Sequence, residues 1–411
     1  MLPEGWKYSN IGEIASNVTS GSRDWAQYYS DTGDKFVRMT NLARDGVRIS
    51  ENDMKFVSIP HDSTDGKRTA LKNGDILISI TAELGKIGLV PSGFGTAFIN
   101  QHLALVRLKN AAASSTFVAY ALSSKKLNQK LNSLNDAGAK AGLNLSTIRS
   151  FPIILPPLPE QKKIAAILST WDRTIEGTEK LLANSQQQKK ALMQQLLTGK
   201  ERLSGFTGEW RICSLSDVAT VQTATSKTQY ICENGERFIV DMGSVNRLGN
   251  LVCTKSTQHN ADLLPKGTLV MPKDDIGGGN IIGRTSYIDR DNLYVLGDHV
   301  YALHIEDCDS KFLHFIINSY PINKNLRRRA NGTAQLGLGK KDVLRQKIKI
   351  PSELPEQKAI AAVLTTADEE IAALESDLFR LRQEKKALMQ QLLTGKASRE
   401  GRLKNVSPQD I

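Results

Sequence analysis

The sequence predicts two copies of a mixed α/β (α+β) domain, separated by two long antiparallel helices that form a coiled coil, with a pseudo-two-fold relation between the copies. Three observations predict this fold class: the length of the chain, a duplicated segment, and a heptad pattern of apolar residues inside the duplicate. The chain has 411 residues, more than one ordinary hydrophobic core accommodates. We therefore expect at least two domains.

The duplicated segment is the strongest of these signals. The motif Leu-Pro-Glu-Gln-Lys occupies residues 158–162 and returns at 354–358, and KKALMQQLLTGK occupies 189–200 and returns unchanged at 385–396. The two pairs have the same offset of 196 positions, so no insertion separates the copies. The chain therefore contains one unit twice.

Apolar residues between these anchors recur in alternating steps of four and three over about five heptads, which is typical of a coiled-coil helix. A proline stands in the first turn of each copy, and each copy ends at Thr-Gly, with Gly199 and Gly395 as C-terminal signals. Each copy predicts a helix of roughly 38 residues, about 57 Å long. Because the first copy carries Thr178, Ser185 and Lys189 on its seam, we expect it to pair with the second copy.

Two blocks of about 150 residues precede the helices and resemble one another faintly. Trp6 matches Trp210, and short apolar runs at 76–80 and 268–271 predict strands. Residues 115–134 and 310–318 predict helices, the first with a Ser or Thr cap available. The expected organisation is a first recognition domain at 1–157, a spacer helix at 158–205, a second domain at 206–352, a second spacer helix at 353–400, and a flexible tail at 401–411.

The direction of pairing follows from the short connection between Gly199 and Trp210. It places the second block where the first helix stops, which favours an antiparallel pair with the blocks at opposite ends of the rod. A purely structural coiled coil remains open on these residues alone.

Composition excludes several classes of protein. No run of 18 apolar residues is present, and the N-terminal residues lack the layout of a signal peptide, so we expect a cytoplasmic protein without a membrane segment. The four cysteines contain no CxxC pair, which favours reduced thiols over metal ligands or disulfides.

The formal net charge of +11 is spread along the chain. It amounts to +5 for residues 1–157, +3 for 158–205, +4 for 206–352 and −1 for the remainder. This distribution suits a polyanion held along an extended surface, whereas a merely soluble basic protein is the alternative. Two similar basic domains on a spacer would contact duplex DNA at two places, separated by at most roughly 17 base pairs. The sequence therefore predicts a bipartite DNA target with a fixed gap.

Several motifs resemble those of the specificity subunits of type I restriction-modification systems. They are LPPLPEQKKIAAIL from residue 155, LPEQKAIAAVL from residue 354, KALMQQLLTGK closing each helix, and GTAQLGLG at 332–339. The resemblance covers the whole chain. The first domain departs from it, because GAKAGLNL at 138–145 stands in place of the GTAQ-type motif.

The resemblance implies a non-catalytic subunit that binds double-stranded DNA, each domain recognising one half of an asymmetric bipartite target. It implies that the helices set the spacing and dock two methyltransferase subunits, with two restriction subunits completing the nuclease. It implies no cofactor in this chain, since S-adenosylmethionine, ATP and Mg would be bound by the other subunits.

Candidate DNA contacts are Arg and Lys residues in polar or glycine-rich loops, which can reach phosphates or guanine edges. Exposed surface is the alternative for each. The candidates in the first domain are Arg23, Lys35, Arg38, Lys86 and Lys140, and those in the second are Lys273, Asn280, Arg284, Arg327, Arg328, Arg329 and Lys340.

Glu160, Gln161, Glu356 and Gln357 are the candidate subunit contacts. The glutamates lie at the positive end of each helix, so capping and a partner-facing role can hold together. His102 and His299 occupy similar places in the two blocks, but no nucleophile or carboxylate recurs beside both, which favours a structural role.

Two rival functions remain. A methyltransferase or nuclease acting alone would need motifs that are missing, since no NPPF-like, DPPY-like or GxxxxGK[ST] stretch occurs. A coiled-coil adaptor that ignores DNA would bind without dependence on salt or on the gap between half-sites.

Overall fold

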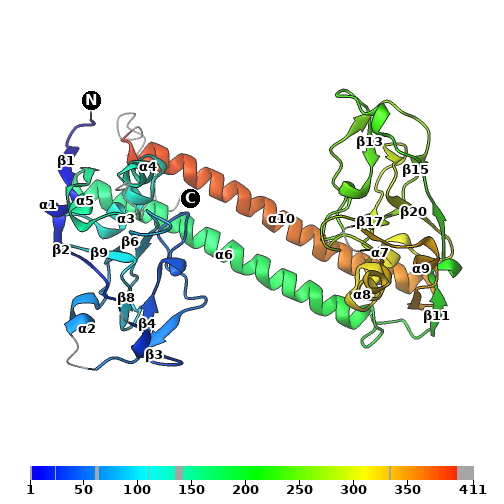
Figure 1. Cartoon of the computed structure of the whole chain (residues 1–411), viewed down its shortest axis with the longest axis horizontal. Coiled ribbons are helices and arrows are strands. Elements are labelled where there is room, and N and C mark those ends of the chain that lie inside the picture. The colour runs from blue at the N-terminus through cyan, green and yellow to red at the C-terminus, as the bar shows by residue number, and fades with distance from the viewer. Residues whose placement is uncertain are drawn as a thin grey trace. The chain divides into compact units, whose positions relative to one another are not determined.

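The computed structural model of the chain describes residues 2–23, 25–60, 64–109, 111–134, 142–332 and 335–395. The chain forms two compact units. Unit 1 comprises residues 1–179 and 376–411, and unit 2 comprises residues 180–375. Each unit therefore contains one globular block together with parts of both long helices (Figure 1).

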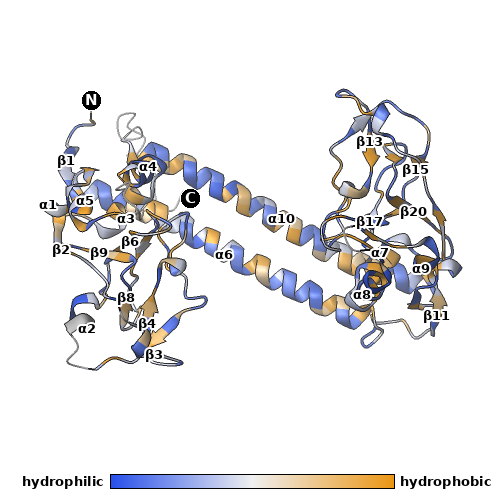
Figure 2. Cartoon of the chain, in the orientation of Figure 1, coloured by the Kyte–Doolittle hydropathy of each residue, from blue (hydrophilic) through white to orange (hydrophobic). Residues whose placement is uncertain are grey.

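The two long helices are α6, Leu158–Leu196, with 39 residues, and α10, Leu354–Leu393, with 40 residues. Hydrophobic and hydrophilic residues alternate along both (Figure 2), and the predicted seam positions are buried or half-buried throughout. The prediction of two long amphipathic helices is confirmed.

The helices run in opposite directions within each unit. In unit 1, Lys385 pairs with Asp172, and Arg382 pairs with Glu179 at 2.8 Å. The residue number falls along α10 as it rises along α6, so the two helices are antiparallel. In unit 2, Lys189 of α6 pairs with Asp368 of α10. These contacts agree with the antiparallel arrangement that the sequence predicts.

The repeated KKALMQQLLTGK segment has the same structural role in both units. The Lys189 ammonium lies 5.6 Å from the ring centroid of Phe315, and the Lys385 ammonium lies 5.5 Å from that of Tyr120. A lysine is tolerated on the apolar seam because its ammonium group forms an ion pair with an aspartate and a cation–π contact with an aromatic ring.

The glycine that ends each repeat lies close to a tryptophan ring. Gly199 has a φ of +69° and a Cβ there would lie 3.3 Å from the Trp210 ring. Gly395 has a φ of +72° and faces Trp6 at 3.4 Å in the same sense. Positive φ and the close ring together favour glycine at both positions.

The first globular block has two four-stranded sheets, with orders β2-β9-β6-β7 and β3-β5-β4-β8, and its end strands β1 and β10 pair antiparallel. Its elements are β1 Lys7–Asn10, α1 Ile11–Ile14, β2 Ala15–Ser20, η1 Trp25–Tyr28, β3 Tyr29–Ser30, β4 Asp34–Val37, η2 Met39–Asn41, β5 Lys55–Val57, α2 Thr64–Thr69, β6 Ile76–Ser79, β7 Ile87–Leu89, β8 Ala97–Ile99, β9 Leu103–Leu108, α3 Ser115–Ser123, α4 Lys125–Ser133, α5 Leu145–Ser150 and β10 Pro152–Leu155.

The second block repeats this plan with sheets β12-β20-β16-β18 and β14-β13-β19-β15, and its end strands β11 and β22 pair antiparallel. Its elements are β11 Trp210–Ser214, η3 Leu215–Asp217, β12 Ala219–Gln222, η4 Thr228–Tyr230, β13 Arg237–Val240, η5 Met242–Ser244, β14 Ser256–Thr257, β15 Leu263–Leu264, β16 Leu269–Pro272, β17 Asp274–Asp275, β18 Ser286–Tyr287, β19 Tyr294–Leu296, β20 Val300–Ile305, α7 Ser310–Asn318, α8 Tyr320–Arg329, β21 Leu336–Gly337, α9 Lys340–Leu344 and β22 Lys347–Pro351.

The segment 115–134, predicted as one helix, forms two. Ser124 has a ψ of 142° and interrupts the helical hydrogen bonds between α3 and α4. Its hydroxyl donates to the Ala121 carbonyl at 2.6 Å, a local bond that competes with helix continuation. Ser319 separates α7 from α8 in the same way, and Pro321 follows it.

Strand registers make positions in the two blocks directly comparable. The parallel ladder of β4 with β8 begins at Lys35, and that of β13 with β19 begins at Phe238. The antiparallel ladder of β6 with β7 pairs Ile76 with Leu89, and that of β16 with β18 pairs Leu269 with Tyr287. Lys35 is therefore equivalent to Phe238, and Leu89 to Tyr287.

Candidate nucleic-acid interface

A basic hollow of about 520 Å³ lies in unit 2 between α8, the turn at 277–283 and β21. Four cationic side chains line it: Arg284, Lys324, Arg327 and Arg328. The exposed ring of Tyr320 stands beside them. Cations and an exposed aromatic ring are the side chains that hold nucleic-acid phosphates and sugars.

Helix α8 places three of these residues on one face. Tyr320, Lys324 and Arg328 follow one another at intervals of four, so they lie along one side of the helix. The Lys324 ammonium donates to the Tyr320 hydroxyl oxygen at 2.6 Å, and this hydrogen bond lowers the pKa of Tyr320. Arg327 lies in the last turn, where the helix dipole favours cations.

The turn that forms the opposite wall is organised by Asp275. Its carboxylate accepts hydrogen bonds from the backbone N–H of Gly277 at 2.6 Å and of Ile281 at 2.8 Å. Gly278 and Gly279 both have positive φ, at +80° and +79°. At these two glycines the turn therefore presents backbone without side chains to the hollow, while Ile282 adds an apolar side chain.

Arg284 lies at the back of the hollow and is half-buried. Its Nη1 donates to the Asn318 carbonyl at 3.3 Å, whereas its buried Nε has no hydrogen-bond partner among the residues that the structure describes. Burial, together with the charge of Arg327, lowers the pKa of the Arg284 guanidinium. A guanidinium with an unsatisfied N–H next to other cations favours an anionic or strongly accepting ligand.

The remaining sequence candidates of the second domain make contacts within it. Asn280 donates to the Gly277 carbonyl at 2.7 Å, Arg329 to the Asp342 carbonyl at 3.0 Å, and Lys340 to the Val221 carbonyl at 2.9 Å. The backbone N–H of Lys273 donates to the His299 carbonyl at 3.0 Å. Of the candidates, the hollow thus gathers Arg284, Arg327 and Arg328.

Two residues of the hollow, Tyr320 and Lys324, escaped sequence reasoning. Their signal is the spacing of four that joins them to Arg328, and it becomes informative only once 320–329 is taken as a separate helix. The GTAQ-type stretch borders the same hollow through Leu336 of β21, and its Thr333 and Ala334 lie outside the described residues.

Lys86 in unit 1 is the structural equivalent of Arg284. Lys86 lies three residues before Leu89, and Arg284 lies three residues before Tyr287, which are equivalent positions of β7 and β18. Each also follows a glycine of positive φ, Gly85 at +76° and Gly283 at +70°. Lys86 pairs with Glu83, however, and is mostly buried. Unit 1 therefore neutralises this cation, whereas its equivalent in unit 2, Arg284, has no acidic partner within the described part of the chain.

Lys35 and Arg38 are also paired within unit 1. The Lys35 ammonium lies 2.6 Å from a Glu51 carboxylate oxygen, and Arg38 Nη2 lies 3.0 Å from the Asp53 carboxylate. These pairs hold the loop 38–53, and the DNA contact expected of both cations stays a prediction. Arg23 is exposed, and Lys140 lies outside the described residues.

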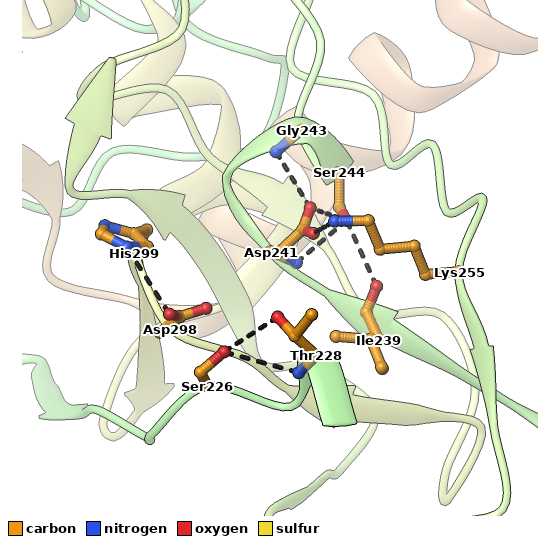
Figure 3. A network of polar contacts seen from close by, with 9 residues as sticks. All are labelled: Ser226, Thr228, Ile239, Asp241, Gly243, Ser244, Lys255, Asp298 and His299. Atoms are coloured by element: carbon orange, nitrogen blue, oxygen red, sulfur yellow. Dashed lines mark hydrogen bonds and ion pairs between the residues drawn. The ribbon is translucent and has the colours of Figure 1, made fainter. Parts of the chain in front are cut away.

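Unit 2 carries the Arg38–Asp53 pair with its charges exchanged. Asp241 occupies the position of Arg38, directly after the equivalent strand, and its partner Lys255 lies just before β14, at the register position of Lys55. Figure 3 shows Lys255 beside Asp241, whose carboxylate also accepts from the Gly243 N–H at 3.0 Å and the Ser244 hydroxyl at 3.2 Å.

The two glutamines of the Leu-Pro-Glu-Gln motifs are buried, which differs from the expected partner-facing role. Gln161 accepts from the Ser114 N–H at 2.9 Å, and Gln357 accepts from the Asp309 N–H at 2.8 Å. Both donate to the carbonyl of a preceding proline, at 2.8 Å in each case. They fasten each long helix to its own globular block.

The two glutamates of these motifs differ in burial and in the side chains that donate hydrogen bonds to them. Glu356 is fully buried and accepts from Arg202 Nε at 2.9 Å and Nη2 at 2.7 Å. Glu160 is half-buried and accepts from the Trp6 indole at 3.2 Å. Full burial leaves Glu356, Gln161 and Gln357 no surface for a partner, so of the four expected contacts only Glu160 retains any.

Within the described ranges of the chain, no group of three or more His, Cys, Asp or Glu side chains is arranged to hold a metal ion. The helices of this part of the chain include none with the length and apolarity needed to cross a bilayer. His102 contacts Thr81, and His299 contacts Asp274 at 2.6 Å.

The family model of the type I restriction modification DNA specificity domain matches residues 3–184 and 207–378. The type I restriction enzyme MjaVIII specificity subunit of Methanocaldococcus jannaschii is 25% identical over 433 residues, covering 99% of this chain and 95% of the relative. The putative MjaX specificity subunit of the same organism is 23% identical over 418 residues, covering 96% and 94%.

Solved structures share the fold. The S subunit of a type I restriction-modification system from M. genitalium has a TM-score of 0.67 at 14% identity, covering 96% of this chain and 99% of that one. A chain from a study of complex assembly in the type I system has a TM-score of 0.53 at 17% identity, with 96% and 99% covered. Since the family model matches both repeats, the chain belongs to the family of type I restriction modification DNA specificity domains, as a specificity subunit.

Proposed function

We propose that the chain is the non-catalytic subunit that recognises a bipartite, asymmetric double-stranded DNA target for a type I restriction-modification complex. The observation that carries the proposal is the basic hollow of unit 2, where Arg284, Arg327 and Arg328 converge beside a glycine-rich turn. Its size and openness suit a phosphate backbone with one or two adjoining base edges. We propose residues 1–157 and 206–352 as the two target recognition domains.

The two halves of the target would differ because the two domains present different side chains at equivalent places. Arg284 of unit 2 corresponds to Lys86 of unit 1, which is paired with an acid. Arg327 and Arg328 correspond to Asn132 and Ser133 at the end of α4. Different donors and different charge at equivalent positions specify different base sequences.

We propose that the paired helices α6 and α10 set the gap between the half-sites. Each helix is continuous over about 40 residues and contributes to both units. A continuous helix has a fixed rise per residue, so its length can define a spacing.

The partners of the proposed complex are two methyltransferase subunits docked on the helices and two restriction subunits beyond them. Cofactors would belong to those subunits: S-adenosylmethionine to the methyltransferases, and ATP and Mg to the restriction subunits. Because the substrate is cellular DNA, we place the complex in the cytoplasm.

The decisive experiment joins the chain to its methyltransferase subunits and determines the methylated motif by sequencing the DNA. We expect two unlike half-sites with a constant gap. Binding of a duplex carrying this motif should weaken steeply with salt and collapse when one base pair is added to the gap. A single continuous motif would contradict the proposal.

A charge-reversal experiment tests whether the basic hollow of unit 2 contacts DNA. The double variant Arg327→Glu/Arg328→Glu should weaken binding to the second half-site and reduce the slope of affinity against salt by about two. Lys266→Glu/Lys347→Glu makes the same change of charge on exposed residues outside the hollow and serves as the control. Equal loss in both variants would remove the hollow from the interface.

A further inference from the structure

A second hollow of about 380 Å³ lies in unit 2, and none of its residues was a candidate from the sequence. It is lined by three aromatic rings, an aliphatic side chain, a thiol and a carboxylate. These are Phe238, Tyr287, Tyr294, Leu251, Cys253 and Asp289.

Two of the aromatic side chains and the carboxylate are in contact with one another. The ring centroids of Phe238 and Tyr294 lie 6.5 Å apart with their planes 37° from parallel. The Tyr294 hydroxyl donates to Asp289 Oδ1 at 2.9 Å, which orients that carboxylate. Burial, and then Asp289, raise the pKa of Tyr294 to about 12.

In unit 1, the place equivalent to this hollow is occupied by the ammonium group of Lys35. By strand register Phe238 corresponds to Lys35. Cys253 corresponds to a carboxylate of unit 1: Glu51 when counted from the backbone bond to η2 and η5, and Asp53 when counted from the ladders of β5 and β14. The Lys35 ammonium lies 2.6 Å from Glu51 and 4.4 Å from the ring centroid of Phe94. A lysine ammonium held between a carboxylate and an aromatic ring therefore occupies this site in one copy of the repeat.

The surroundings of the hollow are acidic although the chain is basic overall. Burial raises the pKa of Cys253 most, and the carboxylates of Asp241 and then Asp289 raise it further. Burial also raises the pKa of Tyr287 most, followed by Asp309. Of the neighbouring cations, Lys255 is bound to Asp241, and Arg290 lies 3.7 Å from Asp289 with both side chains more than half exposed. The Lys311 ammonium lies 5.6 Å from the ring centroid of Tyr287. A phosphate is disfavoured here, and a cation is favoured.

We propose that this hollow binds an alkylammonium or guanidinium group, with the methylene stem against Phe238 and Tyr294 and the charged end on Asp289. Rings and a carboxylate together stabilise such groups through cation–π attraction and a charge-assisted hydrogen bond. The site is independent of the proposed DNA-binding hollow, which lies on other residues of the unit.

The test uses the full chain carrying fluorine-labelled tyrosine, observed by NMR. The probes are Nα-acetyl-lysine N-methylamide, Nα-acetyl-arginine N-methylamide and spermidine, with the neutral Nα-acetyl-norleucine N-methylamide as the control ligand. We expect the cationic probes to shift the signals of Tyr287 and Tyr294 saturably, and the neutral analogue to leave them unchanged. Binding of the amino-acid amides would indicate a protein side chain as the source, and binding of spermidine alone would indicate a free amine.

Two variants and one control test the assignment. Asp289→Asn should weaken binding about tenfold, the loss expected for one charge-assisted contact. Phe238→Lys/Cys253→Glu transplants the unit 1 ion pair and should abolish binding, with folding checked by circular dichroism. Glu233→Gln removes an exposed carboxylate outside the hollow and should change nothing. Unchanged binding in Asp289→Asn, or equal shifts with the norleucine amide, would overturn the proposal.

Discussion

Unit 1 holds the turn after β4 with Arg38 and Asp53, and unit 2 holds the corresponding turn after β13 with Asp241 and Lys255. The geometry is kept while the charges are exchanged. By contrast, the lysine that joins the long helices, Lys385 in one unit and Lys189 in the other, is identical, as are the glutamines of the Leu-Pro-Glu-Gln motifs. The comparison teaches that the helices and their anchors form a common scaffold, whereas the loops of each domain vary around it.

The largest expected effect tests the scaffold. Glu356→Ala removes a fully buried carboxylate that accepts two bonds from the partly exposed Arg202, and hydrogen bonds to a charged group contribute about 1.5–3 kcal/mol. Glu160→Ala removes the half-buried equivalent and should cost about 1 kcal/mol. Urea denaturation followed by hydrogen exchange would assign each loss to its unit. Equal losses would mean that the two anchors are energetically alike.

Acidification should destabilise unit 2 before unit 1. Burial lowers the pKa of His314 from 6.5 to about 4, whereas α3 of unit 1 carries Ala119 at the same helix position. The stability from neutral His314 is present above pH 6.5 and is lost as the pH falls toward 4, because only the unfolded chain binds the proton readily. At pH 5 the loss is on the order of 2 kcal/mol.

Hydrogen exchange between pH 7 and pH 5, with protection mapped by unit, would measure this loss. His314→Ala, the unit 1 residue, should remove the pH slope of unit 2 even though it lowers stability at pH 7. A slope that persists in this variant would place its origin elsewhere.

Arg284 of the second domain should contribute more to DNA affinity than Lys86 of the first domain. Arg284→Ala should weaken binding to the second half-site by about 1–3 kcal/mol, the usual range for one arginine contact. Lys86→Ala should weaken the first half-site less, because Glu83 already neutralises Lys86. Fluorescence anisotropy with duplexes altered in one half-site at a time measures both, and a larger effect for Lys86→Ala would reverse the comparison.

The smallest effect concerns the exchanged ion pair itself. Arg38→Asp and Asp53→Lys should each destabilise unit 1 by about 1 kcal/mol, and the double variant, which copies the charge order of unit 2, should recover most of the loss. Thermal unfolding of the four proteins closes the double-mutant cycle. Additive losses would show that the pair is not interchangeable.

The repeat made the scaffold predictable. An exact duplication with heptad periodicity predicts two long helices that pair, and the structure has them at Leu158–Leu196 and Leu354–Leu393. The candidate site was predictable only in part. Arg284, Arg327 and Arg328 stood out by residue type, but Lys35, Arg38 and Lys86 did so equally, and the structure pairs all three with acids.

The sequence by itself determined the duplication, the helices and the family, because these depend on residue order and on periodicities along one segment. Tertiary structure alone decided which cations keep an acid partner, which glutamate is buried, and where a hollow replaces an ion pair. Those outcomes depend on contacts such as Arg202 with Glu356, 154 residues apart, and no local pattern encodes a distance between segments so far apart in the chain.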